Sequence, residues 1–233
     1  MSIQQQVAQV ETIIRQVRPT AGSPPLAPVT LVAVTKYATV EQMQTAYAAG
    51  IRHFGENKVQ DALDKMASFP ATDYPDLRWH LIGHLQGNKV KKALGRFSLI
   101  HSVDSLPLAE AISNLSTQQG FLQPVLLQVN ISQDASRHGF SPDELLDKAA
   151  QIARLPGLEL RGLMTMAPAE ASLTQNDAAL KAAFSQVATL KSELESRLGI
   201  DLPELSMGMS HDFPQALACG ATIIRIGNYL FKT

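Results

Sequence analysis

The sequence predicts a single (β/α)8 barrel of the TIM type, an α/β fold, with an extra helix at the N-terminus. Short β-type runs alternate with helical stretches along most of the chain, and there are eight such runs. The length of 233 residues suits one barrel, so we expect residues 1–233 to form a single domain. A doubly wound open sheet is the alternative, but no G-x-G-x-x-G motif follows the first run.

The first expected element is a helix with one apolar face. Residues 2–18 place their apolar side chains at helical spacing, and the segment PTAGSPPLAP at 19–28 ends that pattern. Only about seven residues follow the last β-type run, which is too few for a closing helix. We therefore expect the helix within 1–18 to pack on the barrel at that position.

Short apolar runs mark the strands, and helix signals lie between them. The strands are expected at 30–35, 51–55, 78–83, 98–103, 124–130, 158–164, 204–208 and 222–226. Thr39-x-x-Gln42 and Ser141-Pro-Asp-Glu144 match the sequence pattern of a helix capping box. Glycines stand where three helices should end: Gly50, Gly120 and Gly220.

A lysine follows the first expected strand, LVAVT, where the apolar run ends. Active sites of such barrels lie at the carboxyl ends of the strands. A partly desolvated Lys36 at this end would favour its neutral amine, which can attack a carbonyl and form a Schiff base. The alternative is a solvated charge that ends a strand.

Other polar residues follow the remaining strands and suggest a pocket. Ser210 is expected to begin the helix HDFPQALAC as its N-cap, and Gly227-Asn228 offers bare backbone after the last strand. Barrels frequently hold a phosphate in the loops after strands seven and eight, although a plain helix cap explains Ser210 equally well. An amine beside a phosphate site points to a phosphorylated aldehyde, and pyridoxal 5′-phosphate (PLP) is the obvious candidate.

Several other chemistries do not fit the sequence. His80 and His84 fall on one expected strand, where their rings would lie about 13 Å apart, so we expect no metal site. Ser210, His211 and Asp212 are adjacent in sequence, whereas a catalytic triad needs convergence in space.

The charge pattern gives no sign of a polyanionic partner. The net charge is −1, and the basic residues between 89 and 96 suit a solvated helix face, so we expect no nucleic-acid partner. The chain lacks the apolar core of a signal peptide, and no apolar run approaches about 18 residues. With a single cysteine, Cys219, these features predict a cytoplasmic protein without a membrane partner.

Taken together, the motifs resemble a known family over about residues 29–231. They are VAVTK, HFGENKVQ, WHLIGHLQGNK, HSVDS, RHGF, RGLMTM, LSMGMSHDFPQAL and GATIIRIG. In these segments the chain resembles the pyridoxal phosphate homeostasis protein family, which is similar to the N-terminal barrel domain of bacterial alanine racemase.

The resemblance implies a role for eight residues. Lys36 matches the lysine that holds PLP as a Schiff base, and Arg225 matches the arginine that faces the pyridine nitrogen. The matches to phosphate-binding positions are Ser210, Gly227 and the backbone at Asn228. Asn57 matches an asparagine against the cofactor ring, and Met209 resembles pocket wall, as does Met164.

The resemblance also implies a function without catalysis. Such a protein would hold PLP reversibly, supply PLP-dependent apoenzymes, and act as a monomer in vitamin B6 homeostasis and in amino-acid and keto-acid balance. A minimal amino-acid racemase is the alternative, but no second domain is expected after Gly227 to supply a second base. A third interpretation is a lyase that uses Lys36 without a cofactor.

Overall fold

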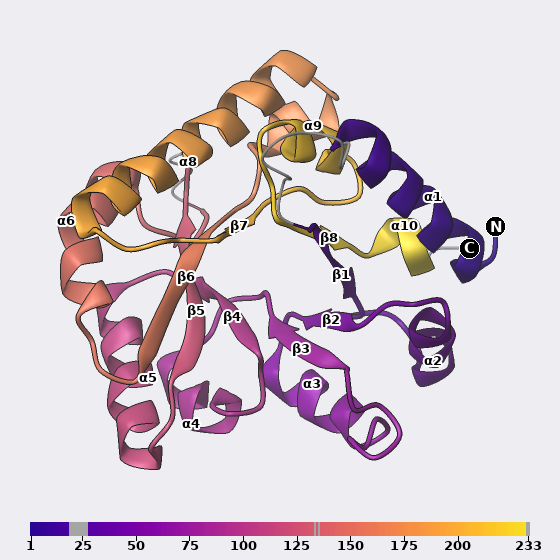
Figure 1. Cartoon of the computed structure of the whole chain (residues 1–233), viewed down its shortest axis with the longest axis horizontal. Helices are drawn as coiled ribbons and strands as arrows, with labels where there is room; N and C mark the ends of the chain where they lie inside the picture. The colour runs from indigo at the N-terminus through magenta and orange to yellow at the C-terminus, as the bar shows by residue number, and fades with distance from the viewer. Residues whose placement is uncertain (19–27, 133, 135, 232–233) are drawn as a thin grey trace.

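The computed structural model describes residues 1–18, 28–132, 134 and 136–231. Eight parallel strands close into a barrel in chain order, with β8 paired to β1, so the predicted (β/α)8 architecture is confirmed (Figure 1). The strands are β1 (Thr30–Val34), β2 (His53–Glu56), β3 (Arg78–Leu81), β4 (Leu99–Val103), β5 (Gln123–Val129), β6 (Leu158–Thr165), β7 (Glu204–Ser206) and β8 (Ile223–Ile226).

Helices follow the strands and surround the barrel. They are α1 (Ile3–Val17), α2 (Val40–Ala48), α3 (Val59–Met66), the 3-10 turn η1 (Gly87–Lys89), α4 (Val90–Ala93), α5 (Leu106–Gln119), α6 (Pro142–Ala153), α7 (Ala169–Leu173), α8 (Asp177–Leu198), α9 (Phe213–Ala218) and α10 (Asn228–Phe231). Thr39 and Ser141 form the predicted capping boxes, and Gly120 ends α5 in the left-handed conformation. Across the described ranges, no helix is both long and apolar enough to span a membrane.

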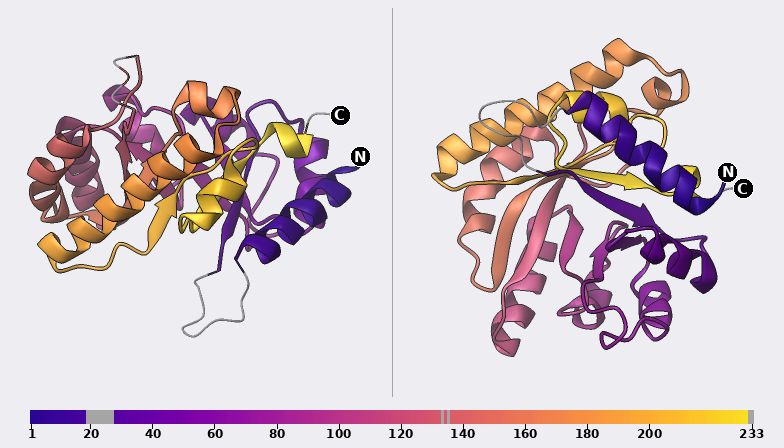
Figure 2. Two further views of the ribbon diagram at one scale, coloured as in Figure 1. Left: turned by 90° about the horizontal axis from the view of Figure 1, so that it is seen from above. Right: turned by 45° about the vertical axis from the view of Figure 1, so that its right-hand side comes forward.

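The N-terminal helix packs on the outside of the barrel near its closing strands. Helix α1 contacts α2, α9 and α10, and it buries Val7 and Val10 against them (Figures 1 and 2). The expectation that no helix follows the last strand is wrong, because α10 forms one short turn directly after β8. Helices α1 and α10 therefore share this side of the barrel.

The barrel interior has an apolar part and a polar part. The apolar layer comprises Val32, Leu99, Leu126, Met164 and Ile223, so Met164 is a core residue here. Buried polar side chains from β3, β4, β7 and β8 occupy another part of the interior: His80, His101, Ser206 and Arg225.

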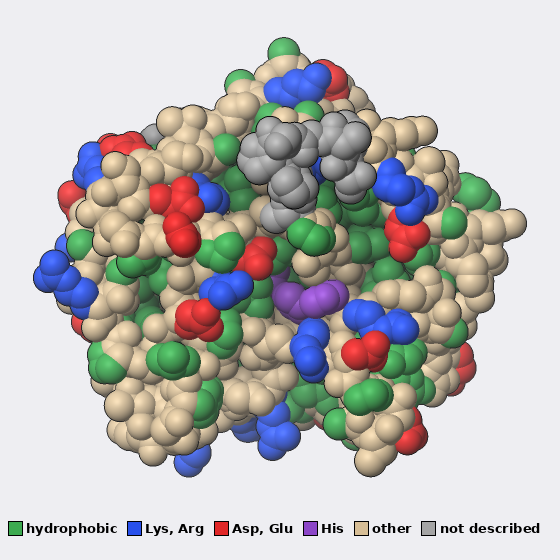
Figure 3. Space-filling model, in the orientation of Figure 1, with side chains coloured by type: hydrophobic (Ala, Val, Ile, Leu, Met, Phe, Trp, Pro, Cys, Tyr) green, Lys and Arg blue, Asp and Glu red, His purple; other side chains and the backbone are tan. Residues whose placement is uncertain are grey.

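The strands begin around an opening that contains titratable side chains. This hollow of about 280 Å³ is lined by residues at the start of all eight strands, His53 and Glu204 among them. In the space-filling view, histidine side chains are visible near the centre of the molecule with basic and acidic groups around them (Figure 3).

Candidate functional site

Two segments far apart in the sequence form a cavity at the carboxyl ends of the strands. Lys36 lies just beyond β1, and Gly227 and Asn228 follow β8, which pairs with β1 in the barrel. The cavity has a volume of about 180 Å³ and is lined by Val34, Lys36, Tyr37, Ala38, Gln42, Gly227, Asn228 and Phe231. None of these lining side chains is acidic. An ammonium group and helix-start backbone therefore face one space, which suits an anionic ligand.

Gly227 allows the ends of β8 and β1 to approach closely. A Cβ atom at this position would lie 3.1 Å from Val34 Cβ and 3.2 Å from the Val34 carbonyl oxygen. A larger side chain would push the two strand ends apart. The glycine therefore brings the start of α10 next to the segment that carries Lys36.

Lys36 is exposed, so the expected partial desolvation of its amine is not present. Its Nζ lies 4.8 Å from the ring centroid of Tyr37, which is 81% exposed, in a cation–π arrangement. The apolar run ends one residue earlier, at buried Thr35. The amine thus remains in contact with solvent at the edge of the cavity.

A buried ion pair lies behind Lys36. The Thr35 hydroxyl donates to Glu56 Oε1 at 2.6 Å, and Lys65 Nζ donates to the same oxygen at 2.7 Å and to the Thr35 carbonyl at 2.6 Å. Glu56 is fully buried, so Lys65 offsets a charge that would otherwise be costly to bury. These bonds fix the backbone before Lys36. Sequence reasoning missed Lys65, which comes from helix α3.

Ser210 does not begin the helix that the sequence predicted. Helix α9 starts at Phe213 with Asp212 at the N-cap position, because Pro214 lacks an N–H and is accommodated in a first helical turn. Asp212 Oδ1 instead accepts from the Met209 N–H at 2.6 Å. The Ser210 hydroxyl accepts from the Tyr229 N–H at 3.4 Å, so Ser210 lies at the start of α10.

Arg225 lies inside the barrel, beneath the mouth. Its Nη1 donates to Ser206 Oγ at 2.6 Å and its Nη2 donates to the Thr165 carbonyl at 2.9 Å. Burial lowers the pKa of Arg225 to about 10, so the guanidinium remains cationic at neutral pH. Two of its five N–H donors are therefore committed to the barrel wall.

Three histidines continue this network across the barrel. Distances of 2.9 Å join Ser206 Oγ to His101 Nδ1, His101 Nε2 to His80 Nδ1, and His80 Nε2 to His53 Nδ1. A guanidinium only donates, so the Ser206 hydroxyl accepts from Arg225, and its own proton is available for His101 Nδ1. With that proton donated to His101, the two bonds between histidines each run from an Nε2–H to the Nδ1 of the next ring. We call Arg225, Ser206, His101, His80 and His53 the histidine column.

The column histidines are held neutral by burial. Burial lowers the pKa of His80 to about 3, with a smaller effect from His53. Burial lowers the pKa of His101 well below its ordinary value, and His80 and Arg225 add to that effect. The pKa of His53 is also lowered, first by burial and then by Arg78. Neutral imidazoles match the donor and acceptor order set by Arg225.

The other predicted residues lie apart from the Lys36 cavity. Asn57 is exposed and lines a separate cavity of about 360 Å³ together with His84, Lys89 and others. Met209 is partly buried, in the turn before α9. The structure thus brings together Lys36, Gly227 and Asn228, and it places Ser210 against the same short helix.

The strand predicted at 78–83 is shorter than expected. Strand β3 ends at Leu81, so His80 points into the column and His84 lies at the barrel rim. The basic residues nearby are all exposed, as a solvated face requires: Lys89, Lys91, Lys92 and Arg96.

Comparison with known proteins identifies the family. The sequence matches the alanine racemase N-terminal domain over residues 6–233. It is 41% identical to the pyridoxal phosphate homeostasis protein of Pseudomonas aeruginosa, over 99% of this chain and 95% of that protein. The chain belongs to the pyridoxal phosphate homeostasis protein family.

Solved structures place the pyridoxal phosphate homeostasis family within a wider fold group. PipY of Synechococcus elongatus PCC7942, solved without PLP and with PLP bound, is 41% identical with a TM-score of 0.86, covering 99% of this chain and 100% of PipY. An alanine racemase of Clostridium difficile is only 13% identical, with a TM-score of 0.71 over 94% of this chain and 57% of its own. The racemase therefore shares the barrel fold with this family.

Proposed function

We propose that this protein binds PLP reversibly in the cavity between β1 and β8 and serves PLP homeostasis. The observation that carries this proposal is the cavity itself, where the Lys36 amine and the backbone of Gly227 and Asn228 face one space, and none of the described lining side chains is acidic. A relative at 41% identity, PipY, has a structure with PLP bound. The donor set fits an anionic aldehyde.

Each residue has a distinct task in this proposal. When bound, PLP supplies an aldehyde that reacts reversibly with amines and a phosphate that carries negative charge. Lys36 provides the amine that holds the aldehyde carbon covalently. The Ser210 hydroxyl and the N–H groups at Gly227 and Asn228 bind the phosphate at the start of α10.

Arg225 supports carriage rather than catalysis. It remains cationic and offers donors but no acceptor to a ring nitrogen. A site with such a residue withholds the proton that would strengthen electron withdrawal by the ring. Asn57 and Met209 do not line the Lys36 cavity, and in this proposal they contact the ring from neighbouring loops, as the family resemblance implies.

The biological role in this proposal is to hold a reactive aldehyde at low free concentration. The exposed position of Lys36 leaves its covalent bond open to competing amines, which favours release to PLP-dependent apoenzymes and an effect on amino-acid and keto-acid balance. We propose that the protein does this as a monomer, which light scattering at several protein concentrations would test.

The direct test is covalent trapping of PLP. Wild-type protein, Lys36→Ala and Lys58→Ala are incubated with PLP, reduced with borohydride and digested for mass spectrometry. Lys58 is also exposed and follows a barrel strand, so its variant is a matched control. We expect a visible absorbance band and a pyridoxyl group on Lys36 in the wild type and in Lys58→Ala. Equal labelling of several lysines, or an unchanged band in Lys36→Ala, would refute the assignment.

A second measurement separates carriage from the racemase alternative. PLP-loaded protein is incubated with L-alanine in deuterium oxide, and exchange at the α-carbon is followed by NMR. We expect exchange no faster than that caused by free PLP at the same concentration. If the wild type exchanges faster than free PLP and Lys36→Ala does not, the protein is a minimal racemase instead.

A further inference from the structure

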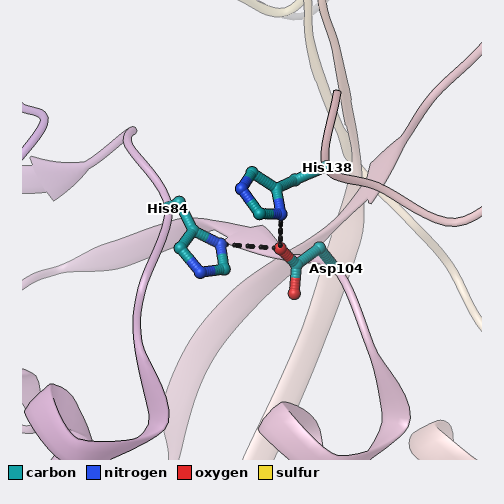
Figure 4. A group of neighbouring side chains, drawn as sticks. All are labelled: His84, Asp104 and His138. Atoms are coloured by element: carbon teal, nitrogen blue, oxygen red, sulfur yellow. Dashed lines mark hydrogen bonds and ion pairs between the residues drawn. The ribbon is translucent and has the colours of Figure 1, made fainter. Parts of the chain in front are cut away.

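Three potential ligand side chains converge at the rim of the barrel, on loops that follow consecutive strands. His84 follows β3, Asp104 follows β4 directly, and His138 lies in the segment between β5 and α6 (Figure 4). One ligand atom from each lies within 4.8 Å of the others. The sequence predicted no metal site here, because His84 was expected to continue the strand that carries His80.

The two histidine–carboxylate separations are close to those around a single metal ion. His84 Nδ1 lies 2.8 Å from Asp104 Oδ2, and His138 Nδ1 lies 3.5 Å from the same oxygen. Metal–ligand bonds of about 2.1 Å place neighbouring ligand atoms about 3.0 to 3.4 Å apart, in an octahedron and a tetrahedron respectively. Both separations therefore lie within a few tenths of an ångström of the spacing that one ion requires.

The backbone near each histidine is fixed by close packing. A Cβ atom at Gly83, next to His84, would lie 2.3 Å from the Asn57 carbonyl oxygen. At Gly139, next to His138, the φ angle is +125° and a Cβ atom would lie 2.8 Å from the Asn130 nitrogen. The Gln128 side chain also donates to the His138 carbonyl at 2.9 Å. Both histidines therefore extend from backbone that is held against the strands.

The two histidine side chains have a common orientation toward the Asp104 carboxylate. The two imidazole rings stack, with centroids 3.9 Å apart and planes 11° apart, and both direct Nδ1 toward one carboxylate oxygen. The Asp104 side chain is only 7% exposed, whereas those of His84 and His138 are 38% and 60% exposed. An ion can thus approach from solvent while the carboxylate stays in place.

We propose that His84, Asp104 and His138 form a binding site for a divalent first-row transition-metal ion. Two imidazoles and one carboxylate suit Zn²⁺, Co²⁺ or Ni²⁺, whereas Mg²⁺ and Ca²⁺ prefer oxygen ligands. Three protein ligands leave at least one coordination position open to water or to another ligand. The site is separate from the PLP cavity and does not depend on PLP binding.

The surroundings indicate which exogenous ligand would complete the coordination. His84 also lines the cavity of about 360 Å³ that is shared with Lys58, Lys89 and Lys92 and has no acidic lining. These lysines are exposed, so solvent and salt screen their repulsion of the ion. An anion such as a carboxylate would be attracted both by the lysines and by the open position of the metal ion.

Direct metal binding tests the proposal on untagged, chelator-treated protein without PLP. Titration with Co²⁺ is followed by visible absorbance, and titration with Zn²⁺ is followed by calorimetry. We expect one ion per chain and d–d bands typical of nitrogen and oxygen ligands. His84→Ala, His138→Ala and Asp104→Asn should each weaken binding by at least the ~10–100-fold that loss of an outer-shell partner costs.

The control is His211→Ala, because His211 is exposed but lies outside the cluster. This variant should bind Co²⁺ as the wild type does, and circular dichroism should show that all variants are folded. Equal affinity in wild type, His84→Ala and His138→Ala would overturn the proposal, as would the absence of binding in the wild type. Displacement of Zn²⁺ by equimolar Mg²⁺ would contradict the assigned class of metal ion.

Discussion

The histidine column and the rim cluster use the same residue type in opposite ways. In the column, His53, His80 and His101 lie within strands β2 to β4. Hydrogen bonds of 2.9 Å use both ring nitrogens of His80 and of His101. In the rim cluster, His84 and His138 lie beyond strand ends and share one carboxylate with an accessible side. Position along a strand therefore decides whether an imidazole is a structural connector or an available ligand.

The difference follows from the dielectric surroundings and from the choice of partners. Inside the barrel, burial disfavours the charged imidazolium form. The Arg225 guanidinium at one end of the column can only donate, so the group next to it must accept a hydrogen bond. At the rim, both imidazoles are exposed to solvent and lie beside the Asp104 carboxylate. Stability measurements should therefore respond strongly to changes in the column and weakly to changes in the cluster.

The largest expected effect is a loss of stability in acid. His80 and His101 stay neutral in the folded protein, whereas in the unfolded chain they bind protons below a pKa of about 6.5. Their contribution is complete above that pH and is lost as the pH falls through it, by about 1.4 kcal/mol per pH unit for each histidine. Urea unfolding should show a free energy of unfolding about 4 kcal/mol lower at pH 5 than at pH 7.

The rim supplies the control for this acid effect. A His84→Ala/His138→Ala double variant should retain the same fall between pH 7 and pH 5. A fall that disappears in the double variant would assign the effect to the cluster and contradict the comparison.

The next effect is expected from removing the centre of the column. His101→Ala creates a cavity and leaves Ser206 and His80 with unpaired polar atoms inside the barrel. We expect a decrease of about 3 kcal/mol in the free energy of unfolding at pH 7.5, measured by urea denaturation. His211→Ala, at an exposed position, should change it by less than about 0.5 kcal/mol.

A smaller decrease is expected when only the hydroxyl of the column is removed. Ser206→Ala deprives Arg225 Nη1 of its acceptor and His101 Nδ1 of its donor. The expected loss is about 2 kcal/mol. Ser136→Ala, which removes an exposed hydroxyl bonded to Asp134, provides the comparison and should have little effect. Equal losses in the two variants would show that burial of the hydroxyl is unimportant.

The smallest effect is expected at the rim without metal. Because His84 is exposed and its hydrogen bond with Asp104 lies at the rim, His84→Ala should change the free energy of unfolding by about 0.5 kcal/mol or less. Added Zn²⁺ should then stabilise the wild type but not this variant, as thermal unfolding would show. Stabilisation of both by the same amount would place the ion elsewhere.

The sequence predicted the barrel because its strands are short apolar runs bounded by turn residues. The structure has a strand at each of these runs. It also predicted that Lys36 and Gly227 would meet, since the carboxyl ends of β1 and β8 adjoin in any closed eight-stranded barrel. The start of α9 was missed although Pro214 carried the signal.

Other features depend on information that spacing does not contain. The column requires the register that sets Gly55 opposite His80, and His80 opposite Leu99. The partner of Glu56 comes from a helix, so its approach depends on how α3 packs. The rim cluster depends on where β3 ends, which was misjudged by two residues at its carboxyl end.

The uniform direction of the hydrogen bonds in the column has a consequence for the whole barrel. With the Ser206 proton donated to His101, every donor is oriented away from Arg225, and the tautomer of His53 at the opposite opening follows from the cation near the mouth. If Arg225 were replaced by a neutral residue, the hydrogen bonds of the column could run in either direction with the same number of polar atoms paired. The nitrogen resonances of one histidine at the floor of the barrel thereby report the charge beneath its mouth, with no movement of the backbone between them.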